Sequence, residues 1–112
     1  MTAEFFEPLS SNGILILKGT LNFTTISVAY KEGAQIIKSQ SNIESSEIFI
    51  DLAAITDANS VILAMLIEWK RLAQAAGKSV SFINLSSNLL KIAKVYDLEI
   101  ILGVKKTVDN GN

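Results

Sequence analysis

The sequence predicts one small α/β domain: a mixed sheet of four to five strands covered by three to four helices. Two observations predict this fold class. Short apolar runs alternate with longer segments whose apolar residues recur at helical spacing, the order expected for parallel strands joined by helical crossovers. Near the N-terminus, Asn12-Gly13 is typical of a tight turn between antiparallel strands. The sheet is therefore predicted to begin with an antiparallel hairpin and to continue with parallel strands.

The hairpin strands are predicted at residues 4–9 and 14–17. Pro8 favours an edge position for the first, because proline lacks the N–H that a central strand donates. The second is an unbroken apolar run, typical of a strand covered on both faces. The first helix follows, capped by Asn22 or Thr24, and Gly33 within it indicates close packing by another element.

The later elements repeat the order of strand and helix. Strands are predicted at 47–52 and 79–84, and between them a central helix runs to Gly77, a residue that commonly ends helices in a left-handed conformation. Ser86 or Ser87 caps a third helix, Asp97 interrupts it, and residues 98–102 form a last short strand or a docking segment. Residues 1–102 are interpreted as the single domain, and 103–112 as a polar tail that we expect to fray.

The central helix carries more apolar side chains than one buried face needs. One interpretation places the core on a stripe made of Ile62, Met65, Leu66, Trp69, Leu72, Ala73 and Ala76, which leaves Val61, Leu63, Ala64 and Ile67 outside it. In the other, Leu63, Leu66 and Ile67 point inward and Ile62 with Met65 is left over. Either surplus predicts a protein partner, although a helix buried on two sides of its own domain produces the same pattern. Trp69 is predicted to be core.

Composition excludes several classes of function. The chain has 112 residues with neither cysteine nor histidine, so thiolate or imidazole zinc sites and Ser–His or Cys–His nucleophile pairs are excluded. A formal net charge of -1 without any block of like charges argues against nucleic acid and anionic membrane surfaces. The acids Asp51, Asp57 and Glu68 show no metal-ligand spacing. We therefore predict no catalytic residue, metal or cofactor, and a protein without enzymatic activity.

Two features of the sequence indicate where in the cell the protein is located. The N-terminus carries acidic residues instead of the positive region of a secretory signal, and the longest apolar run, residues 61–67, is far shorter than a membrane span. A cytoplasmic protein is expected.

A polar elbow, residues 56–60, precedes the central helix. Asn59 and Ser60 are both good N-cap residues, and Ser60 is interpreted first as a helix cap. A phosphate on Ser60 would be tolerated there, because free N–H groups and the helix dipole favour negative charge. Asp57 is interpreted as a turn residue and Asp51 as structural.

Two separated stretches resemble a known family. Residues 19–26, Gly-Thr-Leu-Asn-Phe-Thr-Thr-Ile, are similar to the Gly-Glu-Leu-Thr-Phe-x-Thr-Val of one subgroup. Residues 51–52 and 59–69 resemble the family's Asp-Leu, Asp-Ser/Thr and Leu-Ala-Leu-Leu-Leu-Glu-Trp, and the similarity continues through 90–96. The chain thus resembles a STAS domain, the module of sulphate transporters and anti-sigma-factor antagonists. It is most similar to the STAS subunit of Mla-type phospholipid ABC transporters, also called toluene-tolerance proteins, which maintain outer-membrane lipid asymmetry.

The resemblance implies an adaptor that docks on the transporter's cytoplasmic ATPase and is thereby peripheral to the inner membrane. Ser60 matches the family's phosphorylatable or partner-contacting hydroxyl. Together with the apolar surplus, this predicts a partner-binding set of Asn59, Ser60, Val61, Leu63, Ala64, Ile67, Lys70 and Arg71, with Asn22, Thr24 and Asp57 as neighbours of the elbow. Lys70 and Arg71 are interpreted either as a solvated side or as contacts to acids at a partner's rim.

Two departures from the family pattern affect the alternatives. Asn59 stands where most members have aspartate, and Val61-Ile62 replaces a small residue and glycine, which favours docking over a phosphorylation switch. The alternative is an anti-sigma-factor antagonist, whose partner is a serine kinase that phosphorylates Ser60. An enzyme or nucleotide-binding domain is disfavoured, because no glycine-rich phosphate loop follows a predicted strand.

Overall fold

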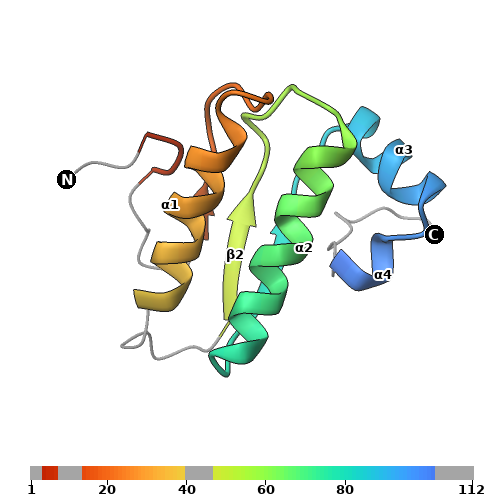
Figure 1. The fold of residues 1–112 in the computed structure, drawn as a ribbon. Coiled ribbons are helices and arrows are strands. Elements are labelled where there is room, and N and C mark those ends of the chain that lie inside the picture. The colour runs from red at the N-terminus through yellow and green to blue at the C-terminus, as the bar shows by residue number, and fades with distance from the viewer. Residues whose placement is uncertain (1–3, 8–13, 40–46, 103–112) are drawn as a thin grey trace.

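The computed structural model describes residues 4–7, 14–39 and 47–102. Three strands and four helices follow one another along this part of the chain (Figure 1). In order they are β1 (Ile14–Ile16), α1 (Ile26–Ser39), β2 (Glu47–Asp51), α2 (Ser60–Ala75), β3 (Ser79–Ile83), α3 (Ser87–Val95) and α4 (Glu99–Leu102). The turn of the predicted hairpin at residues 10–13 and the predicted tail at 103–112 lie outside the described residues.

The three strands form one parallel sheet in the order β1-β2-β3. The register places Leu15, Ile50 and Phe82 side by side across the sheet. The predicted count of four to five strands is not confirmed, because the expected N-terminal strand contributes only an isolated antiparallel bridge between Phe6 and Leu17 within the described ranges. The prediction of parallel pairing for the later strands is confirmed.

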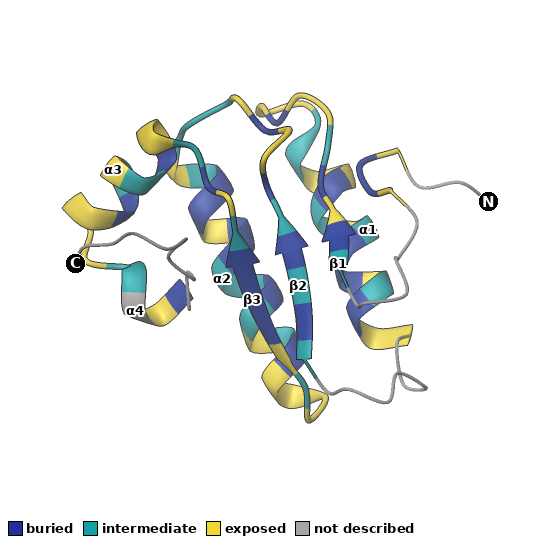
Figure 2. Cartoon of the chain, turned by 180° about the vertical axis from the view of Figure 1, so that it is seen from behind, coloured by how far each residue is buried: buried dark blue, intermediate teal, exposed yellow. Residues whose placement is uncertain are grey.

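Helices α1 and α2 lie together on one face of the sheet (Figure 1), and the strands stand in front of them when the domain is seen from behind (Figure 2). Ile48 and Ile50 of β2 point into this layer and are buried, whereas Phe49 between them is only half-buried. In β1, Ile16 is 40% exposed on the other face. The prediction that β1 is covered on both faces is therefore wrong.

The last elements pack beside α2 instead of extending the sheet. Both α3 and α4 contact α2, and Leu102 at the end of α4 is buried. Of the two interpretations of residues 98–102, the short strand is wrong, because the segment folds as a helical turn. Asp97 takes a positive φ of 59°, which ends α3 as predicted and lets the chain turn toward α4.

Helix α2 is consequently covered on both flanks, by α1 on one side and by α3 and α4 on the other. Its buried residues are Ile62, Leu63, Met65, Leu66, Trp69 and Ala73. Each of the two predicted apolar stripes was too narrow, because Ile62 and Leu63 are both buried in the core. Leu63 is 1% exposed, so its predicted place in the partner-binding set is wrong. The apolar surplus of α2 is therefore explained by burial of the helix on two sides within its own domain.

The seam between α1 and α2 is closed at Gly33. A Cβ on Gly33 would lie 2.3 Å from Cζ2 of Trp69, so only glycine lets the two helices approach this closely. Trp69 is fully buried, its Nε1–H donates to the Tyr30 carbonyl at 3.1 Å, and its ring lies 5.5 Å from that of Phe6. The predictions of close packing at Gly33 and of a core role for Trp69 are both confirmed.

Candidate functional site

The elbow lies at the carboxyl edge of the sheet, at the top of Figure 1. Both α1 and α2 follow strands of a parallel sheet, so both begin at this edge, and they pack side by side. The loop after β1 and the loop after β2 meet there. Asp57 joins them, because its Oδ2 accepts a hydrogen bond from the backbone N–H of Leu21 at 2.9 Å. We call this region, residues 19–25 and 52–60, the carboxyl edge.

Asn59 is the cap of α2. Its backbone is extended, and its side-chain Oδ1 accepts a hydrogen bond from the N–H of Ile62 at 2.9 Å. Asparagine caps helices about as well as aspartate, so the departure from the family pattern keeps the capping function and removes only the charge. Asn59 therefore has a structural role that its half-buried side chain already performs.

Ser60 is the first residue of α2 and not its cap. The interpretation of Ser60 as a capping hydroxyl is wrong, because Asn59 takes that position. Ser60 is exposed, and among the described residues its hydroxyl has no hydrogen-bond partner. The elbow thus presents a hydroxyl group that the fold does not use.

Asp57 has a different role from the predicted local turn. Its carboxylate reaches across 36 positions of sequence to Leu21, whose side chain is fully buried. Asp51 is structural as predicted, since its Oδ1 accepts from the N–H of Ala53 at 2.8 Å and from Nδ2 of Asn84 at 3.1 Å. The two acids stabilise loops at the same edge.

The exposed side of α2 forms a single stripe. Ser60, Ala64, Ile67 and Arg71 recur at intervals of four, three and four residues, which places them one above another on a helix. Ser60, Ala64 and Arg71 are exposed and Ile67 is half-buried. Val61 is also half-buried, and it lies on the flank toward α1, because Met65 and Trp69 follow it at intervals of four. We call Ser60, Ala64, Ile67 and Arg71 the α2 stripe.

The two basic residues predicted for a partner's rim differ in their availability. Lys70 is turned back onto its own fold, where its Nζ donates to the carbonyl of Val80 at 3.1 Å. Arg71 is 70% exposed along its side chain and pairs with Glu68, 2.6 Å away. Exposed pairs of this kind are weak, so the guanidinium can exchange its partner at little cost. Of the two, only Arg71 belongs to the exposed stripe.

The loop before α1 holds the other predicted neighbours of the elbow. Asn22 Oδ1 accepts from the backbone N–H groups of Thr24 at 2.9 Å and Thr25 at 3.2 Å, so Asn22 satisfies donors ahead of α1. Thr24 is not a cap, because its hydroxyl donates to the same oxygen at 2.7 Å. Between them, Phe23 is 87% exposed. Sequence reasoning missed this residue, although an aromatic side chain outside the helical stripe of α1 was the available signal.

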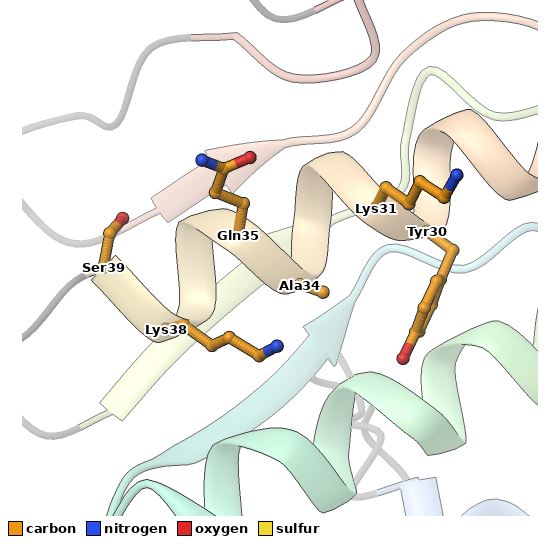
Figure 3. Close-up of a pocket in the computed structure, with 6 residues that line it drawn as sticks. All are labelled: Tyr30, Lys31, Ala34, Gln35, Lys38 and Ser39. Atoms are coloured by element: carbon orange, nitrogen blue, oxygen red, sulfur yellow. The ribbon is translucent and has the colours of Figure 1, made fainter.

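A hollow elsewhere on the molecule is separate from these residues. Its described lining comes from α1 alone, and Tyr30 reaches from there toward α2 (Figure 3). The lining residues are Tyr30, Lys31, Ala34, Gln35, Lys38 and Ser39. None of the predicted site residues lies in this hollow.

Within the described ranges, no three acidic side chains are grouped so that they could hold a metal ion. No described helix combines the length and the apolar character needed to cross a bilayer. The carboxyl edge presents the Ser60 hydroxyl and the exposed phenyl ring of Phe23, and the α2 stripe continues from Ser60 along the helix.

Comparison with known proteins agrees with this fold. A family model described as the MlaB STAS domain matches residues 8–103. A chain of the Acinetobacter MlaFEDB complex in its ATP-bound Vtrans2 conformation is 29% identical, with a TM-score of 0.69 over 84% of this chain and 95% of that one. A chain of the same complex in its ATP-bound Vtrans1 conformation is 26% identical, with a TM-score of 0.67 over 87% of this chain and 96% of that one.

A third solved structure supports the fold alone. The NMR structure of the protein TM1081 has a TM-score of 0.71 at 13% identity, covering 96% of this chain and 82% of its own. No curated protein sequence matches the chain significantly.

Proposed function

The chain belongs to the MlaB family of STAS domains, and from that premise we propose that it is a non-enzymatic adaptor subunit of a phospholipid ABC transporter. It docks on the cytoplasmic ATPase of the transporter through the carboxyl edge and the α2 stripe. The observation that carries the proposal is the similarity to chains solved within the ATP-bound MlaFEDB complex, which spans 95% of one such chain.

The structure supports a docking role for Ser60 and its neighbours. Ser60 is exposed and its hydroxyl has no hydrogen-bond partner in the described part of the chain, and Ala64 and Ile67 continue from it along the same side of α2. Burial of their apolar surface contributes roughly 25 cal/mol per Å² before the costs of association are subtracted. Because Asn59 and not Ser60 caps the helix, the partner can use the Ser60 hydroxyl without weakening α2.

Docking of this kind can regulate the ATPase by differential contact. If the adaptor binds one conformation of the ATPase more tightly than another, it shifts the population toward that conformation. Leu63 and Lys70 take no part in the proposed contact, because Leu63 is buried and Lys70 is bonded to Val80. Because the proposed partner is the cytoplasmic ATPase, the subunit would lie at the cytoplasmic side of the membrane.

The test is Ser60→Arg, measured as the Kd of the full-length chain for the ATPase of its own transporter. A large cation on the first residue of α2 would hold the surfaces apart while leaving the free fold intact, since the exposed Ser60 side chain bonds to none of the described residues. The matched control is Gln74→Arg. Gln74 is exposed on the same helix, about 21 Å from Ser60 at 1.5 Å per residue. Equal affinities for the wild type and Ser60→Arg would contradict docking through Ser60.

A second candidate is an anti-sigma-factor antagonist, and the exposed Ser60 hydroxyl favours it. An exposed, unbonded hydroxyl at a helix N-terminus is accessible to a kinase, and the free N–H groups there accommodate a phosphate. Incubation with the cognate serine kinase and ATP, followed by intact mass measurement, separates the candidates. A phosphate on Ser60 favours the switch, and an unmodified mass argues for the adaptor.

A further inference from the structure

The exposed side chain of Phe23 is the largest apolar feature that the fold leaves unexplained. At 87% exposure it is the most exposed of the large hydrophobic side chains in the described ranges. It lies in the loop between β1 and α1, whose neighbours Leu21 and Ala29 are both fully buried. Nothing in the packing of the residues that the structure describes therefore requires a phenyl ring at position 23.

The turn that carries Phe23 is held rigidly. Asn22 Oδ1 accepts from the N–H and from the hydroxyl of Thr24, at 2.9 and 2.7 Å. Thr25 Oγ1 accepts from the N–H of Asn22 at 2.9 Å and donates to the carbonyl of Thr20 at 2.6 Å. The residues on both sides of Phe23 are thus fixed by side-chain hydrogen bonds, so the backbone beneath the ring is pre-organised.

The same loop is fixed to the elbow. The hydrogen bond from Leu21 N–H to Asp57 joins the loop of Phe23 to the loop of Ser60. The two loops run beside each other at one end of the domain in both ribbon views (Figures 1 and 2). Val28, on the first turn of α1, is also exposed, at 41%. The surface proposed for docking therefore continues from Ser60 toward the start of α1.

From this arrangement we propose that Phe23 is an anchor residue of the adaptor, inserting its ring into an apolar pocket on the transporter ATPase. This inference rests on the proposed function and adds to it a second point of contact on a different loop. Aromatic anchors on rigid backbone are typical of the residues that dominate binding, because they bury a large area and lose little conformational freedom. Ser60 and Phe23 then fix the orientation of the subunit by two contacts.

The experiment compares Phe23→Ala, Tyr96→Ala and Ser60→Arg, each in the full-length chain, with the wild type for their Kd toward the purified ATPase. Phe23→Ala is expected to weaken binding about 30-fold, the loss typical of a hot-spot residue. Tyr96→Ala is the matched control, since Tyr96 is an aromatic residue exposed by 60% at the end of α3, and it is expected to change the Kd less than twofold. Unchanged far-ultraviolet circular dichroism and thermal midpoint show that each variant is folded.

The outcomes separate the two proposals. If Ser60→Arg weakens binding and Phe23→Ala does not, the anchor is wrong and the adaptor function stands. If neither variant weakens binding, the adaptor function itself is wrong. Equal losses for Phe23→Ala and Tyr96→Ala would overturn the anchor, because any exposed aromatic would then suffice. A change in the oligomeric state of the free chain with Phe23→Ala, at unaltered ATPase affinity, would identify a second copy as the occupant and also overturn it.

Discussion

The α1–α2 seam and the carboxyl edge use side chains in opposite ways. At the seam, Trp69 is fully buried against Gly33, and a single missing Cβ decides how closely the helices approach. At the carboxyl edge, the side-chain oxygens of Asn22, Asp57 and Asn59 accept hydrogen bonds from backbone N–H groups and hold the loops in place. The side chains of Phe23 and Ser60 remain exposed. The seam stabilises the fold by excluding solvent from apolar side chains. The carboxyl edge fixes the shape of two loops and leaves side chains exposed on them.

This difference indicates where the domain can be changed without loss of its fold. Apolar burial at the seam contributes stability in proportion to area, so a change of volume there is felt throughout the core. Hydrogen bonds at the edge each contribute about 1 kcal/mol, and they mainly fix geometry. Substitutions at the seam are therefore expected to alter stability, and substitutions at the edge are expected to alter binding more than stability.

The largest expected effect is at the seam, for Gly33→Ala. Alanine favours a helix over glycine by about 1 kcal/mol, but its Cβ would lie 2.3 Å from Trp69, and overpacking commonly costs about 1–3 kcal/mol. Because the Trp69 ring is fully buried and has no room to move aside, we place the cost at the upper end of this range. We therefore expect a net loss of about 2 kcal/mol in the free energy of unfolding, measured with urea.

The control for this prediction is the same substitution in a Trp69→Leu background. Leucine removes the ring atoms that the new methyl group meets, so Gly33→Ala should become neutral or stabilising by up to about 1 kcal/mol there. An equal loss in both backgrounds would show that the ring is not the cause. That result would contradict the view that close packing against Trp69 sets the stability of the seam.

At the carboxyl edge, Asp57→Ala is expected to cost about 1–2 kcal/mol of stability, because Leu21 N–H loses its acceptor in a partly buried position. Its effect on ATPase affinity should be the more informative measurement, since the two loops lose their connection. Asp57→Asn keeps an oxygen acceptor and serves as the control. Indistinguishable affinities for Ala and Asn would mean that the connection does not position the surface.

The smallest expected effect concerns the cap. Asn59→Ala removes the acceptor for Ile62 N–H and should lower stability by about 1 kcal/mol. Asn59→Asp keeps that acceptor and adds a charge that the helix dipole favours, so we expect a change within about 0.5 kcal/mol. Thermal unfolding of both variants checks this. A large loss with aspartate would indicate that the uncharged amide has a role beyond capping.

Much of the fold could be predicted because its signals are local. Gly77 ends α2 with a φ of 76°, Ser86 caps α3, and Asp97 interrupts the chain after it, all as the sequence indicated. Such features depend on a few adjacent residues. The breadth of the buried arc on α2 depends instead on α3 and α4, which arrive from 20 residues or more along the chain, and so Leu63 was misplaced.

The candidate site divides along the same line. The elbow was located by its motif, yet the assignment of the cap to Asn59 instead of Ser60 is a matter of one residue in register, which only geometry decides. Asp57 binds Leu21 and Lys70 binds Val80, both over intervals that periodicity does not describe. Phe23 was missed because exposure cannot be read from a residue type, and most aromatic residues are buried.

The burial of Ile62 and Leu63 has a consequence for the order of assembly. The proposed adaptor can therefore fold without its partner, because its apolar core is closed, and it can accumulate as a free pool before it binds the transporter. For the proposed adaptor, occupancy of the ATPase would therefore follow its concentration in the cell, which makes abundance itself a means of control.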